Sequence, residues 1–193
     1  MADTIKKGTE LATIDVVCVA IKPSGGDDVL ILNTSNQIQV TTATETQEKV
    51  ALIVKGVLIA QKPQEVTVTG NTVVMTDNVF NPELVLILQG GTIKYDTVDT
   101  SKVIGYTPPV VGSSDKGKVF DLMVYSAIYD AAGLIKGYER ITYPNCQGVP
   151  VAFNSQDGAF RAPEYTINSA PNNGQAPYDI DIVDSLPTVT ASA

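Results

Sequence analysis

Apolar and polar positions alternate with a period of two over most of the chain, and many of the apolar positions are β-branched. This period is typical of β-strands, whose side chains point alternately to the two faces of a sheet. Clusters of Gly, Pro, Asn and Asp separate the runs and predict turns. The pattern predicts a mainly β chain, with strands expected at residues 11–20, 28–32, 50–60, 92–95, 119–130, 134–143, 149–153, 160–167 and 178–183, and as two stretches, 66–68 and 73–75, within 64–77.

One short segment carries the signals of a helix. Asn81 is placed as an N-cap, Pro82 falls at the first helical position, and Gly90 and Gly91 supply the stop. The interior, residues 84–88, is apolar on nearly every side. A helix without a polar face is covered on more than one side, so we expect it to pack against the sheet and its loops or against another subunit.

Two segments lose the alternation and predict long loops. Residues 33–49 are rich in Thr, Gln and Asn and bury little apolar surface, so we expect a long loop or an exposed, weakly paired extension. Residues 96–118 are rich in Gly, Pro and Ser and predict a second long loop. We expect one domain over residues 1–193 that carries these loops and a polar tail at 188–193.

The predicted hairpin of residues 119–130 and 134–143 is apolar on both faces. Phe120, Leu122 and Val124 lie on one face of its first strand. Met123 and Tyr125 lie on the other. An antiparallel sheet with one solvated face normally has one polar side, so we expect both faces of this hairpin to be covered.

Composition narrows the classes of function. Of the 193 residues, 44% are apolar, which is enough to fill a core. Thirteen Lys and Arg stand against twenty-one Asp and Glu, and the formal net charge is −8. Most of the surface therefore cannot bind nucleic acid by neutralising phosphates. The chain contains no His, the commonest general base and a frequent metal ligand. A general DNA-binding protein and a conventional enzyme are both disfavoured.

Targeting and thiol chemistry add two expectations. No apolar run approaches eighteen residues, and the polar N-terminus lacks a signal-type apolar run, so we expect a soluble protein made in a cytoplasm. Cys18 and Cys146 are too few and too far apart for a disulfide framework or a zinc knuckle, and we expect two buried thiols.

The tyrosines that crowd the second half either edge the core or mark a subunit interface.

Residue types that form metal, phosphate-binding or nucleophile sites in other proteins do not form such a site in this sequence. Asp179, Asp181 and Asp184 could suggest a calcium site, but alternation with Ile180 and Ile182 places Asp179 and Asp181 on the polar face of a strand, which we favour over a calcium loop. Residues 112–118 lack the spacing of a phosphate-binding loop. Cys146 has no neighbouring His or ordered basic cluster that would activate it. We therefore predict no catalytic residue, no metal and no cofactor.

Several short segments, taken in order, resemble the major tail tube protein of long-tailed bacteriophages and related prophages of Gram-positive hosts. They span roughly residues 55–187, whereas the first fifty residues match poorly. The segments are 56–63 (Gly-Val-Leu-Ile-Ala-Gln-Lys-Pro), 76–91 around Asn-Pro-Glu-Leu, 105–109 (Gly-Tyr-Thr-Pro-Pro), 143–150 (Tyr-Pro-Asn-Cys-Gln-Gly-Val-Pro), 160–167 (Phe-Arg-Ala-Pro-Glu-Tyr-Thr-Ile), and 176–178 (Ala-Pro-Tyr) leading to Leu186-Pro187.

The resemblance implies a β-sandwich or barrel-like fold with one flanking helix. Six copies would close into a ring, and the rings would stack into a hollow tube that conducts DNA without binding it specifically. The implied location is the tail of a virion, assembled in the cytoplasm of a host bacterium. The implied partners are further copies and other tail proteins: a ruler, a completion protein and, in a contractile particle, a sheath. A membrane is not implied.

The resemblance also places subunit and ring contacts in the two predicted loops and the hairpin. The candidate contact residues are Asn36, Gln39, Tyr106, Pro108, Pro109 and Tyr125.

The acidic charge suits a channel for DNA, because a basic wall would bind the phosphates. From strand alternation and loop position, we expect some of four acids, Glu45, Glu48, Asp179 and Asp181, to face the channel. The alternative is another β-sandwich module of a virion or cell surface, such as a head-decoration or adhesin domain, which would stay monomeric or trimeric. An enzyme would instead need polar groups that converge in a deep pocket.

Overall fold

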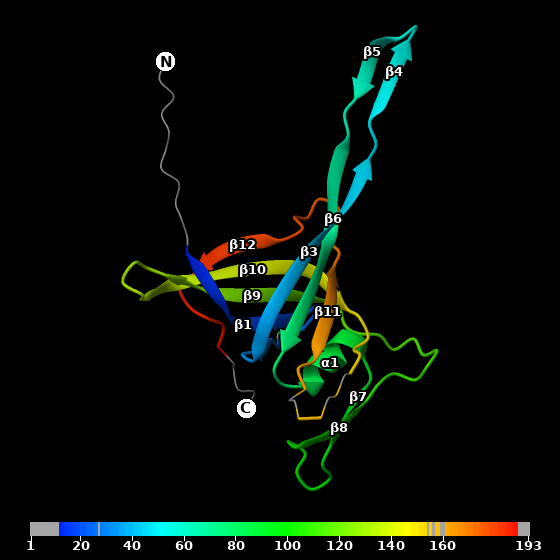
Figure 1. Ribbon diagram of the computed structural model, residues 1–193. Helices are drawn as coiled ribbons and strands as arrows, with labels where there is room; N and C mark the ends of the chain where they lie inside the picture. The colour runs from blue at the N-terminus through cyan, green and yellow to red at the C-terminus, as the bar shows by residue number, and fades with distance from the viewer. Residues whose placement is uncertain (1–11, 27, 154, 156, 159–160, 189–193) are drawn as a thin grey trace.

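The computed structural model describes residues 12–26, 28–153, 155, 157–158 and 161–188, and it is mainly β, as the sequence predicts (Figure 1). One helix accompanies the strands in this part of the chain. The elements are β1 (Thr13–Pro23), β2 (Leu30–Leu32), β3 (Ser35–Gln47), β4 (Val50–Val54), β5 (Val57–Lys62), β6 (Glu65–Asp77), α1 (Pro82–Gln89), β7 (Thr92–Tyr95), β8 (Val103–Thr107), β9 (Phe120–Tyr129), β10 (Ile135–Gly148), β11 (Glu164–Ser169) and β12 (Asp179–Val183).

The main sheet folds over itself into two layers. Its strand order is β2-β1-β9-β10-β11-β6-β3, and β12 also pairs with β10. All of these pairings are antiparallel. Strands β3, β6 and β11 cross over β1, β9 and β10 (Figure 1). The first layer is therefore β2-β1-β9-β10-β12, the second is β11-β6-β3, and the arrangement is sandwich-like.

Strand β10 joins the two layers because it bends at Pro144 and Asn145. Its register with β9 shifts at this point, and Asn145 has a φ of 50°, in the left-handed region that Asn tolerates. The Asn145 N–H donates to the Asp121 carboxylate at 3.1 Å, and the Ser169 hydroxyl donates to the Pro144 carbonyl at 2.7 Å. A bulge of this kind bends a strand, and beyond it residues Cys146–Gly148 pair with β11.

The main core fills the space between the two layers. The central strand β9 contributes Phe120, Leu122 and Val124, which is the face that the sequence pattern predicts. Large side chains from β1, β6, β11 and the helix complete the core, and the fully buried ones include Ile21, Met75, Leu84, Leu88, Tyr165 and Ile167.

The opposite face of β9 is also covered, as the sequence predicts. Tyr125 packs there with Cys18 and Ala20 in a second, smaller cluster. Partly buried apolar side chains from β2, β9, β12 and the C-terminal segment complete it: Val29, Ile31, Met123, Val183 and Leu186. Both faces of the first layer can be apolar because one packs in the main core and the other in the smaller cluster around Tyr125.

Helix α1 closes one end of the sandwich and has the predicted caps. The Asn81 side-chain oxygen accepts the N–H groups of Glu83 and Leu84 at 2.9 and 3.2 Å, and Gly90 ends the helix with a φ of 81°. A Cβ at Gly148 would lie 2.5 Å from the Leu88 backbone. Glycine at this position therefore lets the end of β10 approach the helix closely.

The expected loop at residues 33–49 is wrong, although the expected exposure is right. Ser35–Gln47 forms strand β3, which is exposed over most of its length and pairs with β6 from end to end. The Thr-rich and Gln-rich composition indicated too little apolar surface for a core strand. An edge strand with a solvated face needs little, because β6 supplies its hydrogen bonds.

Four other expectations need correction. The loop at 96–118 contains strand β8, which pairs with β7. The run at 50–60 is two strands, because Lys55 and Gly56 form a tight turn with positive φ at both residues. Residues 64–77 form one strand, β6, and not two stretches. Residues 149–153 form no strand, because Pro150 has no N–H and the Val151 N–H donates to the Gln89 side chain at 2.8 Å.

Three expectations touch residues outside the described part. The expected strand at 160–167 begins at residue 160, and the described strand is Glu164–Ser169. The polar tail at 188–193 lies outside it except for Thr188. The expectation of an N-terminus without a signal segment falls mostly on residues 1–11.

Candidate assembly surfaces

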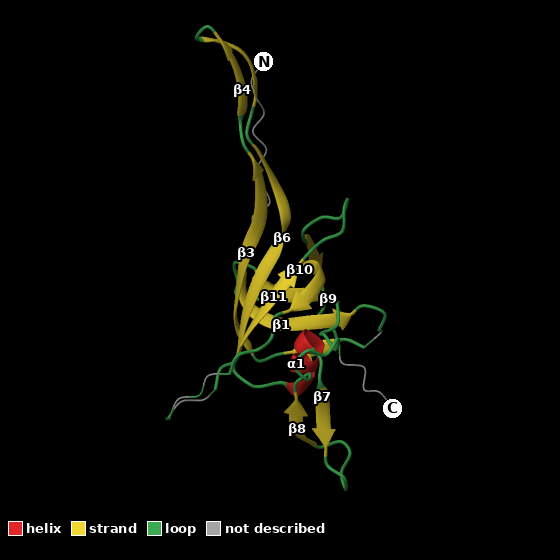
Figure 2. Ribbon diagram, turned by 90° about the vertical axis from the view of Figure 1, so that its right-hand side faces the viewer, coloured by secondary structure: helices red, strands yellow, loops and turns green. Residues whose placement is uncertain are grey.

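A long two-stranded arm extends from the second layer. We define the arm as residues 44–68, which include the outer ends of β3 and β6 and the whole of β4 and β5. Strands β4 and β5 pair antiparallel around the Lys55–Gly56 turn. Figures 1 and 2 both show the arm projecting well away from the sandwich. Within the described part of the chain, β4 and β5 pair only with each other.

The arm is apolar on both faces. Ile53 pairs with Leu58 and Val54 pairs with Val57, and successive pairs point to opposite faces. Nine large apolar side chains of the arm are between 43% and 65% exposed: Val50, Leu52, Ile53, Val54, Val57, Leu58, Ile59, Val66 and Val68. Exposed apolar surface on this scale marks an interaction site in a folded protein.

An isolated two-stranded hairpin of this kind is at best marginally stable in water. The outer edges of β4 and β5 also present unpaired backbone groups, which invite pairing with another chain. Exposed apolar side chains and unpaired strand edges are both typical of a segment that a partner covers, and the arm has both. Gly56 between two apolar runs was the signal in the sequence that could have predicted it.

A second apolar projection lies at the opposite end of the molecule. Strands β7 and β8 form a hairpin there, and Figures 1 and 2 both place it away from the arm, beyond helix α1. Val98 in its turn is 94% exposed, and Val111 in the segment that follows β8 is 100% exposed. The molecule thus presents apolar contacts at both ends of one long axis.

The outer face of the second layer is mainly polar, and the positive charge recorded beside it comes from Lys62 of β5, whose Nζ lies 3.6 Å from Glu65 and 2.9 Å from the Gln47 side-chain oxygen at the arm end. Strands β3, β6 and β11 contain no Lys or Arg over their whole described length. Thr72 of β6 and Asn168 of β11 share this face and are hydrogen-bonded side chain to side chain at 3.0 Å. On β3, the alternation that starts at Gln39 brings Thr41 and Glu45 to the same face. Uncharged polar groups and carboxylates therefore predominate on this surface, and Lys62 compensates the charge of Glu65.

The four candidate channel acids do not share one surface. Glu45 lies on the outer face of β3, and Glu48 follows the end of that strand; both are exposed. Asp179 and Asp181 lie on β12, in the other layer. The structure thus brings together Glu45 and Glu48 in the arm region and separates them from the β12 pair.

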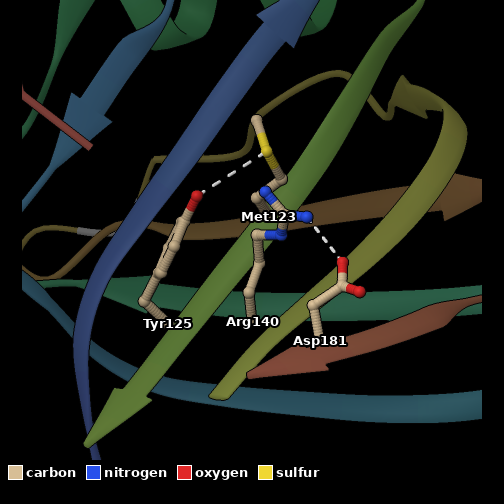
Figure 3. Close-up of polar contacts among 4 residues, drawn as sticks. All are labelled: Met123, Tyr125, Arg140 and Asp181. Carbon is tan, nitrogen blue, oxygen red and sulfur yellow. Dashed lines mark hydrogen bonds and ion pairs between the residues drawn. The ribbon is translucent and has the colours of Figure 1, made fainter. Parts of the chain in front are cut away.

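Asp181 is held by an ion pair with Arg140 of β10 (Figure 3). The two residues face each other across the strand pair, and the hydrogen bond from Arg140 to Asp181 raises the pKa of the guanidinium. Tyr125 lies beside them and is almost fully buried, with its hydroxyl 3.9 Å from the Met123 sulfur. The negative charge of Asp181 is compensated locally.

The remaining candidate contact residues lie in two places. Asn36 and Gln39 are exposed on β3. Tyr106 on β8 is half-buried, and its hydroxyl donates to the Gly90 carbonyl and accepts from the Gln89 amide. Pro108 is exposed and Pro109 is half-buried, just beyond β8.

Sequence reasoning missed an apolar patch on β12. The predicted alternation of Asp179 and Asp181 with Ile180 and Ile182 is correct. The two isoleucines are 50% and 59% exposed, so nothing in the described chain covers them fully. Their position on a strand that pairs on one side only makes this edge a second candidate contact.

Comparison with known proteins gives little similarity. No family model and no curated protein matches. One solved structure that matches is titled "Cryo-EM structure of the anti-feeding prophage (AFP) baseplate, 6-fold symmetrised", with 10% identity, a TM-score of 0.36, and coverage of 95% of this chain and 98% of that chain. A TM-score this low carries no inference about fold or function.

Both thiols are free and buried, as the sequence predicts. Burial raises the pKa of Cys18 to about 11 and that of Cys146 to about 12. Among the described residues, no group of three or more Cys, Asp and Glu could hold a metal ion, and no helix is long and apolar enough to cross a membrane.

We expect the native protein at pH 8 to react slowly with a disulfide reagent such as Ellman's, and the unfolded protein to release two equivalents at once. The thiolate is the reactive form, and burial suppresses it in the fold. Because the folded pKa values exceed 9.0, the folded state keeps protons that the unfolded state loses, so the free energy of unfolding falls as the pH rises above about 9. Rapid reaction of a native thiol would contradict this burial.

Proposed function

We propose that this protein is the structural, non-enzymatic subunit of a phage or phage-like tail tube, in which six copies form a ring and the rings stack around a channel for DNA. The observation that carries the proposal is the arm. Nine exposed apolar side chains on a two-stranded hairpin need a cover. The resemblance of residues 55–187 to tail tube proteins supports identical copies as that cover.

The two ends of the molecule support a polar, head-to-tail stack. The arm lies at one end and the β7–β8 hairpin at the other. A contact between unlike ends is heterologous, and a heterologous contact repeats without limit along an axis. Stacking of rings therefore follows if the arm of one copy meets the far end of a copy in the next ring.

The edges of the first layer support the contacts within a ring. Strands β2 and β12 each pair on one side only within the described chain, and β12 adds Ile180 and Ile182. Edge strands that pair between subunits lose their tendency to aggregate. Closure of the ring requires that each copy bind its neighbours through two different edges, which this layer offers.

The outer face of β3, β6 and β11 is the proposed channel wall. Its strands carry exposed carboxylates at Glu45, Glu65 and Glu164 and no Lys or Arg, although Lys62 of the neighbouring β5 pairs with Glu65 at 3.6 Å. Such a wall repels phosphates and keeps water and cations between itself and DNA, so the DNA slides. Asp179 and Asp181 lie on the other layer, so this proposal places Glu45 at the wall and leaves the β12 acids outside it.

Electron microscopy of the purified chain at high concentration tests the assembly. We expect six-fold rings or straight tubes from the unmodified chain. We expect neither from the double variant Leu52→Asp/Leu58→Asp, because two carboxylates on the arm disrupt its apolar contact with the neighbouring copy. The free energy of unfolding should change by less than about 0.5 kcal/mol, since both side chains are exposed.

The control for this experiment is Leu134→Asp, an exposed leucine in the β9–β10 turn, which should still assemble. Discrete monomers or trimers of the unmodified chain at high concentration would favour a head-decoration or adhesin module and overturn the tube.

The charge of the channel wall has its own test. We expect assembled wild-type tubes to retain no DNA, and tubes of the variant Glu45→Lys/Glu65→Lys/Glu164→Lys to retain it in a manner that weakens steeply with salt. Co-sedimentation of short double-stranded DNA with the tubes at two salt concentrations measures the difference. Equal retention by both tubes would show that this face does not line the channel.

A further inference from the structure

A mostly apolar cavity lies beside helix α1, at the end of the molecule away from the arm. Its volume is about 490 Å³. It lies between the C-terminal end of the helix, the segment after β8 and the end of β10. Its apolar and backbone lining comes from Leu88, Pro108, Pro109, Gly117, Gly148 and Pro150.

Of the four polar side chains that line this cavity, Gln89 and Asp115 are engaged by hydrogen bonds, and Lys116 and Gln147 are exposed. Gln89 donates to the Tyr106 hydroxyl at 2.9 Å and accepts from the Val151 N–H at 2.8 Å. Asp115 accepts from the Gly91 N–H at 3.0 Å. Among the described residues, the buried side-chain polar atoms without a partner belong to Asp77, Arg140 and Tyr165, none of which lines the cavity. An apolar occupant therefore fits better than a polar small molecule.

The cavity is also held in shape before anything binds. The Lys118 N–H donates to the Ile87 carbonyl at 2.8 Å and ties the preceding loop to the helix. A Cβ at Gly117 would lie 2.1 Å from the Leu88 carbonyl oxygen, so loop and helix are in close contact there. A preformed site loses little entropy when a segment enters it.

We propose that this cavity is the receptor for the tip of the arm of a second copy, an inference that rests on the proposed stacking. The tip presents Val54 and Val57 on either side of the Lys55–Gly56 turn, and both valines are about half exposed. It is a narrow apolar wedge, and the cavity is an apolar recess of the same chain. The arm cannot reach the cavity of its own copy, because the two lie at opposite ends (Figures 1 and 2).

The length of the arm supports this occupant. From Ala43 to Val54 the chain runs outward through the end of β3, the two-residue link 48–49 and β4, which corresponds to at most about 36 Å at about 3.3 Å per residue. A compact domain of this size has a radius of gyration of about 16 Å. The arm is therefore long enough to pass alongside a neighbouring copy and reach the region around its α1.

Charge at the tip and at the rim supports one orientation. Lys55 is the only charged residue of the turn. Asp115 is exposed at the cavity and is anchored by its bond to the Gly91 N–H. Lys116 also lines the rim and would repel Lys55, so the proposed docking places Lys55 on the Asp115 side of the rim, and the valines supply the apolar contact. Exposed ion pairs by themselves contribute little.

Disulfide cross-linking in assembled tubes of the full chain tests the receptor. The native cysteines are buried, so the pair Val57→Cys with Pro109→Cys can be followed without interference. The control pair is Val57→Cys with Val98→Cys, which places the second thiol on the same end of the molecule but in the β7–β8 turn. We expect roughly tenfold more intermolecular cross-links from the first pair, because docking raises the local thiol concentration.

The outcomes separate the two proposals. Tubes in which Val98→Cys cross-links as well as Pro109→Cys, or in which neither does, would overturn the receptor and leave the stacking intact. Absence of rings and tubes from the unmodified chain would overturn both.

A second measurement needs no substitution. Carbodiimide treatment of wild-type tubes should join Lys55 to Asp115 of another copy, as read by mass spectrometry. A Lys55 joined only to other carboxylates would overturn the receptor even if the cysteine variants failed to assemble.

Discussion

The burial of the arm is the requirement on which the rest of this molecule depends. Nine apolar side chains stand about half exposed on a hairpin that has no third strand within the described chain. Completing their burial is worth on the order of 10 kcal/mol per copy, at about 1.5–3 kcal/mol for each fully buried side chain. That is comparable with the whole stability of an ordinary domain. Assembly that covers the arm would therefore stabilise the chain about as much as its own core does.

The sandwich is built so that it can carry this arm. Strands β3 and β6 are paired inside the second layer and continue outward as the base of the arm, so the core that holds Met75 and Val73 also fixes the direction of the projection. The bend of β10 at Pro144 and Asn145 ties that layer to the first. The apolar cluster around Tyr125 then covers the back of the first layer. The base of the arm thus belongs to the core sheet, and β4 and β5 extend it as a separate two-stranded sheet.

The sequence predicted local features better than the long-range pairing. The helix between Asn81 and Gly90 and the two covered faces of β9 follow from signals within a few residues. Strand β3 was missed because its hydrogen-bond partner, β6, begins eighteen residues after it ends, and its few large apolar residues gave no sign of a sheet although Thr favours strands. Glu45 and Asp181 both fall in strand-like sequence, and only the sheet order shows that they lie in different layers. The receptor cavity arises from three segments far apart in sequence.

The central proposal is that the apolar faces of the arm are uncovered in a single copy and become covered by identical copies. Amide hydrogen exchange at residues 50–62 of the full chain, measured in dilute solution and again in the assembled form, tests it directly. We predict fast exchange in dilute solution, because a lone hairpin opens readily, and strong protection in the assembly. Protection equal to that of the core strands in the dilute chain, or fast exchange that persists in the assembly, would contradict the account.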